Sequence, residues 1–169
     1  HGKSYWEAAL PNDMPNRQSH IKEMNKRAYQ LWPTIMSEHA RVFPNVYQTL
    51  HQLKNRGAKL GIVTGSGKST VDLLFSVGVE SLFDAVVNGE DISKRKPDSE
   101  GLLKCLQILD VEPDDALYVG DTAIDAQAST AAGICSVAVL SGAGDAKSLA
   151  KAGAYRIISD HSALIGLLE

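Results

Sequence analysis

The chain has 169 residues, of which 44% are hydrophobic and 22% are charged, so it is long enough to bury a core without disulfides or a structural metal. Its formal net charge is −3, and acidic and basic residues are mixed along it, which argues against nucleic acid or an anionic membrane surface as a partner. No apolar run approaches the ~20 residues that a membrane span needs, and we expect a cytoplasmic protein with no membrane partner.

Residues 1–42 differ in pattern from the rest of the chain. Apolar residues recur there at roughly helical spacing among charged ones, without the alternation that is typical of strands. Pro11, Pro15 and Pro33 interrupt the pattern. The segment therefore predicts two or three helices that form an appendage to a domain beginning at residue 43.

From Pro44 onward, helical patterns alternate with short apolar runs. We predict helices over 45–56, 69–77, 98–109, 122–132 and 145–152. All but the third are followed by a glycine that suits the left-handed position past a helix end. We predict strands over 58–64, 83–87, 116–120, 134–140 and 155–158.

Strands that alternate with helices imply parallel pairing with right-handed crossovers. These strands are almost continuously apolar, which indicates that helices cover both faces of the sheet. The fold class predicted is therefore α/β, with a doubly wound parallel sheet. Ligands of such sheets bind at the carboxyl ends of the strands.

Two of these strand ends carry a hydroxyl or a cation. Thr64-Gly65-Ser66 follows the first predicted strand, and the hydroxyl and backbone N–H groups there would suit an anion. By itself this stretch also fits an ordinary turn with Ser/Thr capping. Lys96 lies in a basic loop before Pro97, where it could direct a cation into a cleft, although a lone basic run also fits solvated surface charge.

A third strand end carries two carboxylates. Asp121 follows the strand predicted over 116–120, and Asp125 lies one helical turn further on the same side. Such a pair suits a hard cation such as Mg²⁺, although either residue singly could be a helix cap or a first-turn acid. A hydroxyl, a lysine and a carboxylate pair, in this order, are the groups that phosphoryl transfer requires.

The order and spacing of these motifs resemble the haloacid dehalogenase (HAD) superfamily, in its phosphoglycolate phosphatase-like and β-phosphoglucomutase-like branch. The strand ending at Thr64 resembles motif II of that family, Lys96-Pro97 resembles motif III, and Gly120 to Asp125 resembles motif IV. The resemblance implies a Rossmann-like core over 43–169 and a partial helical cap over 1–42. It also implies a Mg²⁺-dependent phosphatase that acts on a small phosphorylated metabolite through an aspartyl-phosphate.

The resemblance also implies residue roles. Thr64 and Lys96 would be catalytic, because Thr64 would hold the phosphoryl group and Lys96 would neutralise charge between nucleophile and phosphate. Gly65 and Ser66 would complete the substrate-binding set with these two residues.

The carboxylates complete the implied site, and one motif is missing from it. Asp121 would ligate Mg²⁺, and Asp125 would support the metal directly or through water. Motif I, an Asp-x-Asp pair after the first strand, has no counterpart in the sequence. We therefore expect an N-terminally incomplete sequence, inactive by itself, whose absent strand would lie between those ending at Thr64 and Asp121.

Two other functions remain open from the sequence. Gly67-Lys68-Ser69 matches the end of a Walker A phosphate loop, but the first glycine of that motif would fall at Ile62. A P-loop nucleotide-binding protein is therefore one alternative. The other is a non-catalytic, degenerate HAD module that binds phosphorylated ligands or a partner. The sequence does not distinguish a phosphatase from a phosphomutase, and it indicates neither the substrate nor the oligomeric state.

Overall fold

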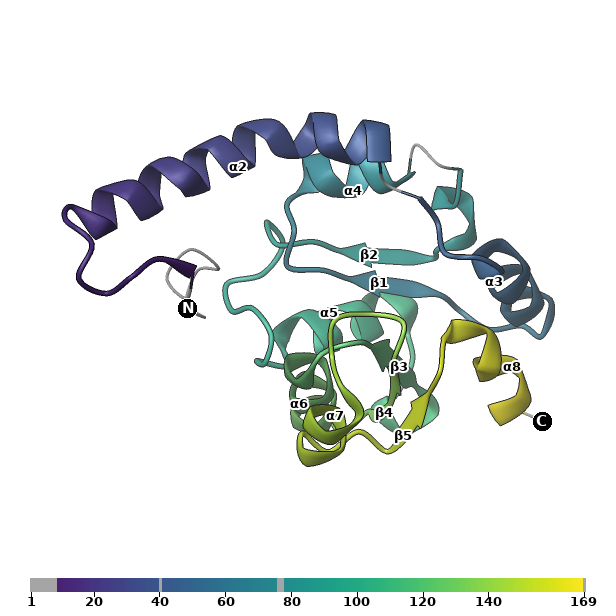
Figure 1. The fold of residues 1–169 in the computed structure, drawn as a ribbon. Coiled ribbons are helices and arrows are strands. Elements are labelled where there is room, and N and C mark those ends of the chain that lie inside the picture. Colours follow the sequence, from purple (N-terminus) through teal and green to yellow (C-terminus); the bar gives the residue numbers. More distant parts are fainter. Residues whose placement is uncertain (1–8, 40, 76–77, 169) are drawn as a thin grey trace. The chain divides into compact units, whose positions relative to one another are not determined.

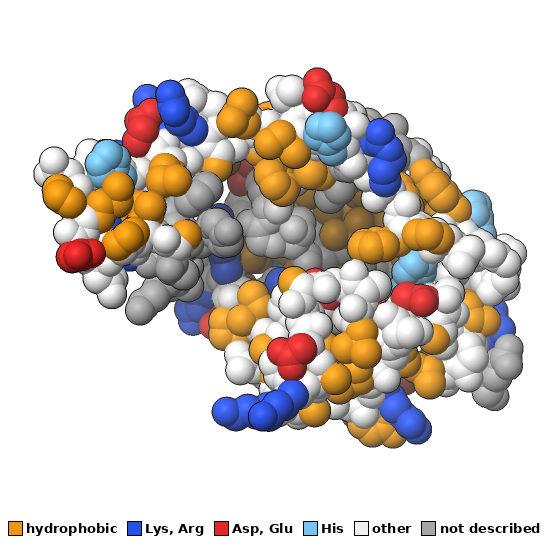
Figure 2. Space-filling view, in the orientation of Figure 1, with side chains coloured by type: hydrophobic (Ala, Val, Ile, Leu, Met, Phe, Trp, Pro, Cys, Tyr) orange, Lys and Arg blue, Asp and Glu red, His pale blue; other side chains and the backbone are white. Residues whose placement is uncertain are grey.

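The computed structural model describes residues 9–39, 41–75 and 78–168 (Figure 1). The chain divides into two compact units, His1–Arg41 and Val42–Glu169. On the face drawn in Figure 2, acidic and basic side chains of the described residues are interspersed among hydrophobic ones rather than gathered by sign. Across the described ranges, every helix is too short or too polar to span a bilayer.

The first unit contains one long described helix, α2 (Arg17–His39). It follows Pro15 and begins after Asn16, whose φ of 54° is left-handed. Pro33 lies inside α2, so the interruption expected at this residue is wrong. A proline removes one hydrogen bond and crowds the preceding turn, but the flanking turns can carry a helix through it. That this unit is part of a cap stays a prediction.

The second unit has the predicted alternation of helices and strands. Its elements in chain order are α3 (Val46–Asn55), β1 (Gly61–Val63), α4 (Lys68–Phe75), η1 (Glu80–Leu82), β2 (Ala85–Val87), α5 (Glu100–Leu109), η2 (Pro113–Asp115), β3 (Leu117–Gly120), α6 (Ala123–Ala132), β4 (Cys135–Val139), α7 (Ala146–Lys151), β5 (Arg156–Ile158), η3 (His161–Ala163) and α8 (Leu164–Leu167). The glycines predicted to follow helices all have positive φ, namely Gly57, Gly78, Gly133 and Gly153.

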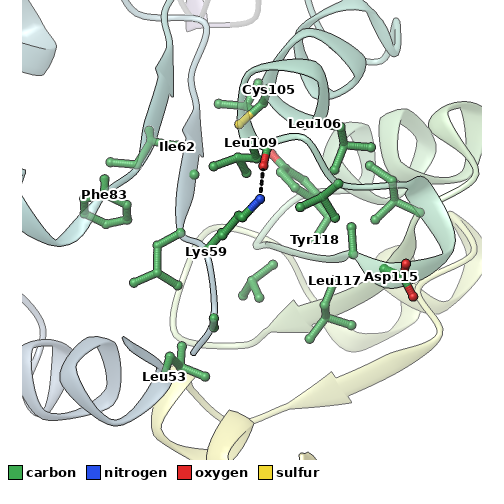
Figure 3. Close-up of a pocket in the computed structure, with 18 of the residues that line it drawn as sticks. Leu53, Lys59, Ile62, Phe83, Cys105, Leu106, Leu109, Asp115, Leu117 and Tyr118 are labelled. Atoms are coloured by element: carbon green, nitrogen blue, oxygen red, sulfur yellow. Dashed lines mark hydrogen bonds between the residues drawn. The ribbon is translucent and has the colours of Figure 1, made fainter. Parts of the chain in front are cut away.

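The strands form parallel ladders, which confirms the predicted α/β class. β1 pairs with β2, with Gly61 opposite Ala85, and β3, β4 and β5 pair in that order. The sheet is thus in two parts, because among the described strands β1 and β3 do not pair with each other. An apolar cavity lies between these two strands (Figure 3).

Two hydrophobic clusters hold the second unit together, and α5 contributes to both. Leu102 of α5 is buried in one cluster against α6, and Cys105 is buried in the other against β2. The buried face of α6 carries small residues, including Ala128 and Ser129, so its backbone can pack closely on the sheet. Ser129 is satisfied there because its Oγ donates to the carbonyl of Ile134 at 2.6 Å. These contacts hold α6 against the sheet, so that its first turn lies just after the end of β3, where Asp121 and Asp125 are found.

Candidate functional site

Thr64 ends the first strand in a tight turn. Its N–H continues the ladder by donating to the carbonyl of Val87 at 2.9 Å, and its Oγ1 accepts from the N–H of Ser66 at 3.1 Å. The carbonyl of Ser66 accepts from the N–H of Gly89 at 2.7 Å. A side chain at Gly89 would collide with the carbonyl of Gly65, so the turns after β1 and β2 can approach closely only with glycine there.

This turn affects the predicted anion site. A hydroxyl has one donor and can accept two hydrogen bonds, so Thr64 can accept from Ser66 and still donate its own proton to a ligand. The N–H of Ser66 is already engaged in that contact. Binding of a phosphate oxygen by this amide would therefore require the turn to open, whereas the Thr64 hydroxyl needs no rearrangement.

Lys96 is partly buried at the ends of two strands. Its Nζ donates to Asp125 Oδ1 at 2.7 Å, to the hydroxyl of Tyr118 at 2.9 Å and to the carbonyl of Val63 at 3.4 Å. Only 17% of the Lys96 side chain and 8% of the Asp125 side chain are exposed. The alternative that Lys96 is a solvated surface charge is therefore wrong.

Asp125 is held by donors on both of its oxygens. Oδ1 accepts from Lys96 and from the Tyr118 hydroxyl, and Oδ2 accepts from the backbone N–H of Thr122 at 3.1 Å and from the Thr122 hydroxyl. Thr122 and Asp125 form a capping box at the start of α6. A side chain at Gly120 would overlap Asp125, which explains the glycine that precedes the first carboxylate. Asp125 thus caps the helix and pairs with Lys96 at the same time.

In the cluster of Lys96, Asp125 and Tyr118, hydrogen bonds and charge interactions outweigh the tendency of burial to neutralise the lysine and the carboxylate. Burial by itself would lower the pKa of Lys96, but its interactions with Tyr118 and Asp125 outweigh that and raise it. Burial would raise the pKa of Asp125, but hydrogen bonds from Lys96 and Thr122 hold it below its usual value. Burial raises the pKa of Tyr118, so its phenol stays protonated and can donate to Asp125. The cluster therefore holds a lysine cation and a carboxylate at neutral pH.

Asp121 lies on the other side of Thr122, at the end of β3. Its Oδ2 accepts from the N–H of Ala143 at 2.8 Å, and its carbonyl accepts from the N–H of Gly144 at 2.9 Å. A side chain at Gly142 would collide with the Asp121 carboxylate. The loop after β4 thus wraps closely around Asp121 and fixes its orientation.

Only two of the predicted residues are in direct contact, and the others are neighbours in sequence of residues that contact this pair. Lys96 and Asp125 meet directly. Thr64 directly follows Val63, whose carbonyl accepts from Lys96, and Asp121 directly precedes Thr122, which is bonded to Asp125. Tyr118 belongs to the site and was missed from the sequence, where it reads as one more apolar residue of a strand.

A magnesium site would rest on Asp121. No set of three or more His, Cys, Asp and Glu side chains in the described ranges could hold a metal. Mg²⁺ commonly uses one or two protein carboxylates and keeps waters and substrate phosphates as its other ligands, so Asp121 fits such a role. Direct ligation by Asp125 would require it to give up its contacts to Lys96 or Thr122.

In the loop that resembles the end of a Walker A motif, the Glu90 carboxylate accepts a hydrogen bond from the backbone. The N–H of Lys68, at the start of α4, donates to Glu90 Oε1 at 3.0 Å, and the Lys68 ammonium pairs with Asp72 at 2.9 Å. A side chain at Gly67 would come within 2.7 Å of Glu90 Oε1. The helix N-terminus that a nucleotide phosphate would use therefore already accommodates a negative charge.

The chain was compared with known proteins. The family model of haloacid dehalogenase-like hydrolases matches residues 8–139. The pyrophosphatase PpaX of Bacillus thuringiensis (strain Al Hakam) is 39% identical over 98 residues, which cover 57% of this chain and 45% of that protein. The chain thus spans less than half the length of the curated relatives that it matches.

Solved structures share the fold. A candidate β-phosphoglucomutase from Thermotoga maritima superposes with a TM-score of 0.79 at 24% identity, over 95% of this chain and 79% of that one. A predicted phosphoglycolate phosphatase from Haemophilus somnus 129pt has a TM-score of 0.77 at 23% identity, over 95% of this chain and 69% of that one. With the family match over most of its length, the chain belongs to the haloacid dehalogenase-like hydrolases.

Proposed function

We propose that this protein is a Mg²⁺-dependent phosphatase that hydrolyses a small phosphorylated metabolite. The reaction would pass through an aspartyl-phosphate, and the attacking aspartate would lie outside residues 1–169. The observation that carries the proposal is the partly buried Lys96 ammonium, held between the end of β1 and the Asp125–Tyr118 pair. Family membership supports the hydrolase class.

Lys96 has a proton to spare for a phosphate oxygen. An ammonium has three N–H donors, and two of them make short bonds to Asp125 and Tyr118. The third meets the carbonyl of Val63 at 3.4 Å, which is long for a hydrogen bond. A phosphate oxygen near Val63 would compete easily for this donor. Lys96 would then stabilise the negative charge of the transferred group without leaving its partners.

Thr64 and Asp121 would complete the phosphate site. The Thr64 hydroxyl would donate to a second phosphate oxygen, because its lone pair already accepts from Ser66. Asp121 would hold Mg²⁺, oriented by the contact with Ala143, and the ion would neutralise negative charge on the phosphate. Asp125 would act through Lys96 and Thr122 rather than on the substrate.

The names of similar proteins suggest two substrate classes. The structural neighbour from Haemophilus somnus is named for phosphoglycolate, a small phosphomonoester. The curated relatives are named for pyrophosphate, and their 39% identity makes an inorganic anhydride the second candidate substrate. Both substrates present a terminal phosphoryl group, so the same lysine and hydroxyl would serve either.

The test is phosphate release by the protein expressed from its complete reading frame. Phosphoglycolate, sugar phosphates and pyrophosphate would be assayed with Mg²⁺ and with a chelator. Lys96→Ala should lower the turnover by about 100-fold or more, since it removes a charge-stabilising donor. Lys68→Ala is the matched control, because this lysine is exposed and paired with Asp72, and it should leave turnover unchanged.

Other outcomes would identify the alternatives. ATP binding that is lost with Lys68→Ala and kept with Lys96→Ala would support the nucleotide-binding function. Binding of phosphorylated ligands without any turnover would support the non-catalytic module. Full Mg²⁺-dependent turnover by Asp121→Asn would exclude Asp121 as the metal ligand.

A further inference from the structure

The loop between β2 and α5 carries three consecutive basic residues, Lys94, Arg95 and Lys96. Lys94 pairs with Asp98 at 3.8 Å, and Lys96 pairs with Asp125 at 2.7 Å. Arg95 is exposed, and its guanidinium has no hydrogen-bond or ion-pair partner among the described residues. The N–H donors of this guanidinium are therefore available to a ligand, whereas the two lysines beside it are already paired with carboxylates.

Hydrogen bonds on both sides of Arg95 hold its backbone in place. The two carboxylate oxygens of Glu100, in the first turn of α5, accept from the N–H of Ser93 at 2.7 Å and of Lys94 at 2.8 Å. The carbonyl of Arg95 accepts from the N–H of Asp98 at 3.1 Å. Because the backbone is fixed, a ligand that binds the guanidinium has only the side chain to immobilise, which lowers the entropic cost of binding.

The side chain of Arg95 lies beside the turn that follows β1. A side chain added at Gly65 would have Arg95 Cδ as its nearest neighbour, 3.9 Å from the added Cβ atom. Gly65 follows Thr64, whose hydroxyl would donate to the phosphate in the proposed function. Lys96 contacts Val63, the residue before Thr64. The two adjacent bases thus lie against the residues on either side of Thr64, and the Arg95 guanidinium extends beyond Cδ within reach of a ligand held there.

The two bases suit two different anionic groups. Lys96 is partly buried and would hold the phosphoryl group that is transferred. Arg95 is at the surface, and a guanidinium presents parallel N–H groups that match both oxygens of a carboxylate or a phosphate. A substrate that engages both bases carries a second anionic group close to its phosphoryl group. Phosphoglycolate has a carboxylate in that place and pyrophosphate has a second phosphate, whereas ethyl phosphate has only a methyl group.

We infer that Arg95 is a specificity-determining residue that binds a second anionic group of the substrate, next to the phosphoryl group held by Thr64 and Lys96. The substrate class would then be small phosphate compounds with a neighbouring carboxylate or phosphate, in preference to esters of neutral alcohols. The inference rests on the proposed function, because it uses the same phosphate site. The alternative is that Arg95 is a solvated surface charge, which would bind no particular group of the substrate.

The test compares substrates that differ in the second anionic group. The protein expressed from its complete reading frame would be assayed with Mg²⁺ on phosphoglycolate, pyrophosphate and ethyl phosphate. Arg95→Gln should lower kcat/KM for phosphoglycolate or pyrophosphate by about tenfold or more, because a charge-assisted hydrogen bond is lost. It should change kcat/KM for ethyl phosphate by less than about twofold, since an exposed charge that makes no contact is screened by solvent and salt.

Two further variants separate contact from charge. Lys94→Gln removes the same charge one residue away, from a side chain that is 73% exposed and pairs with Asp98. It should leave the ratio of the kcat/KM values for phosphoglycolate and ethyl phosphate within about twofold of the original. Arg95→Lys keeps the charge but loses the planar fork, so its ratio should fall between those of the original protein and Arg95→Gln.

The outcomes separate this inference from the proposed function. An equal fall for all three substrates in Arg95→Gln, or an equal change of the ratio in Lys94→Gln, would overturn the inference and leave the phosphatase standing. If the original protein turned over none of the substrates, the phosphatase would fail, and calorimetric titration with phosphoglycolate and ethyl phosphate would decide on Arg95. A preference for phosphoglycolate that is lost in Arg95→Gln would support the inference, and equal affinities or no binding would overturn it.

Discussion

The polar cluster around Lys96 and the cavity beside it meet at Val63 but differ in how completely they are built. In the cluster, both oxygens of Asp125 and the hydroxyl of Tyr118 have partners. At the cavity, the facing edges of β1 and β3 have no strand partner among the described residues, and the Nε2 of His161 has no hydrogen-bond partner there. The comparison shows that the polar cluster is held together by contacts among strands β1 and β3, the loop that carries Lys96 and helix α6, although β1 and β3 do not pair with each other.

The largest expected effect tests whether the polar cluster is as tightly coupled as its contacts indicate. Asp125→Ala leaves the Lys96 charge partly buried without its carboxylate and removes half of the capping box. We expect a loss of about 3–5 kcal/mol in the free energy of unfolding, measured by urea denaturation. Asp72→Ala, at the exposed pair with Lys68, should cost only about 0.3–0.5 kcal/mol. Similar losses of unfolding free energy in the two variants would mean that the buried pair is no more tightly coupled than the exposed one.

A second pair of variants compares a buried leucine that lines the cavity with one that lies in a closed part of the core. Leu102 and Leu149 are equally buried, at 1% and 0% exposure, but only Leu102 lines the cavity. Leu149→Ala should cost about 3 kcal/mol, because it creates a void in a packed region. Leu102→Ala should cost roughly 1 kcal/mol less, because the space left by the side chain would open into the cavity instead of forming a closed void. A larger loss for Leu102→Ala in thermal or urea unfolding would mean that the cavity is filled in solution.

A smaller effect concerns the helix cap within the polar cluster. Thr122→Ala removes the hydroxyl that donates to Asp125 and accepts from the start of α6, and should cost about 1 kcal/mol. Thr122→Ser keeps the hydroxyl and should lie close to the original stability in the same denaturation assay. If serine were as costly as alanine, packing of the methyl group rather than capping would explain the loss.

The smallest effect is the pH dependence of the cluster. The pKa of Asp125 in the folded chain lies below its ordinary value of 3.8, so its stabilisation is present above 3.8 and is lost as the pH falls through the folded value. The pKa of Lys96 is raised above 10.5, so its contribution is present below 10.5 and is lost as the pH rises through the folded value. The stability difference between the original chain and Asp125→Ala should therefore be flat between about pH 5 and 9. A slope in that interval would contradict the assigned charges.

The elements of the fold could be predicted from the sequence because their signals are local. Helix ends at Gly57, Gly133 and Gly153 follow from the left-handed position that glycine favours, and all have positive φ. Strand lengths were predicted less well. The strand predicted over 58–64 is observed only as Gly61–Val63, since ladder pairing rather than apolar composition decides where a strand begins and ends.

The candidate site could be predicted only in part, because its contacts join distant segments. Lys96, Asp121 and Asp125 were found from their positions after strands. The contact between Lys96 and Tyr118 could not be predicted, since an apolar strand gives no indication of which side its tyrosine hydroxyl reaches. The contact of Glu90 with the start of α4 could not be predicted either, because Glu90 lies in the loop after β2, far from α4 in the sequence.

Val63 belongs to both regions, and this has a thermodynamic consequence. Its carbonyl accepts from Lys96, and its backbone groups point away from β2, on the side of the cavity. A donor that takes up this carbonyl from the cavity would release the third proton of Lys96 for an anion, so the two binding events would favour each other. Such coupling is reciprocal: an anion on Lys96 would tighten the hold on that donor by the same factor as the donor tightens the hold on the anion.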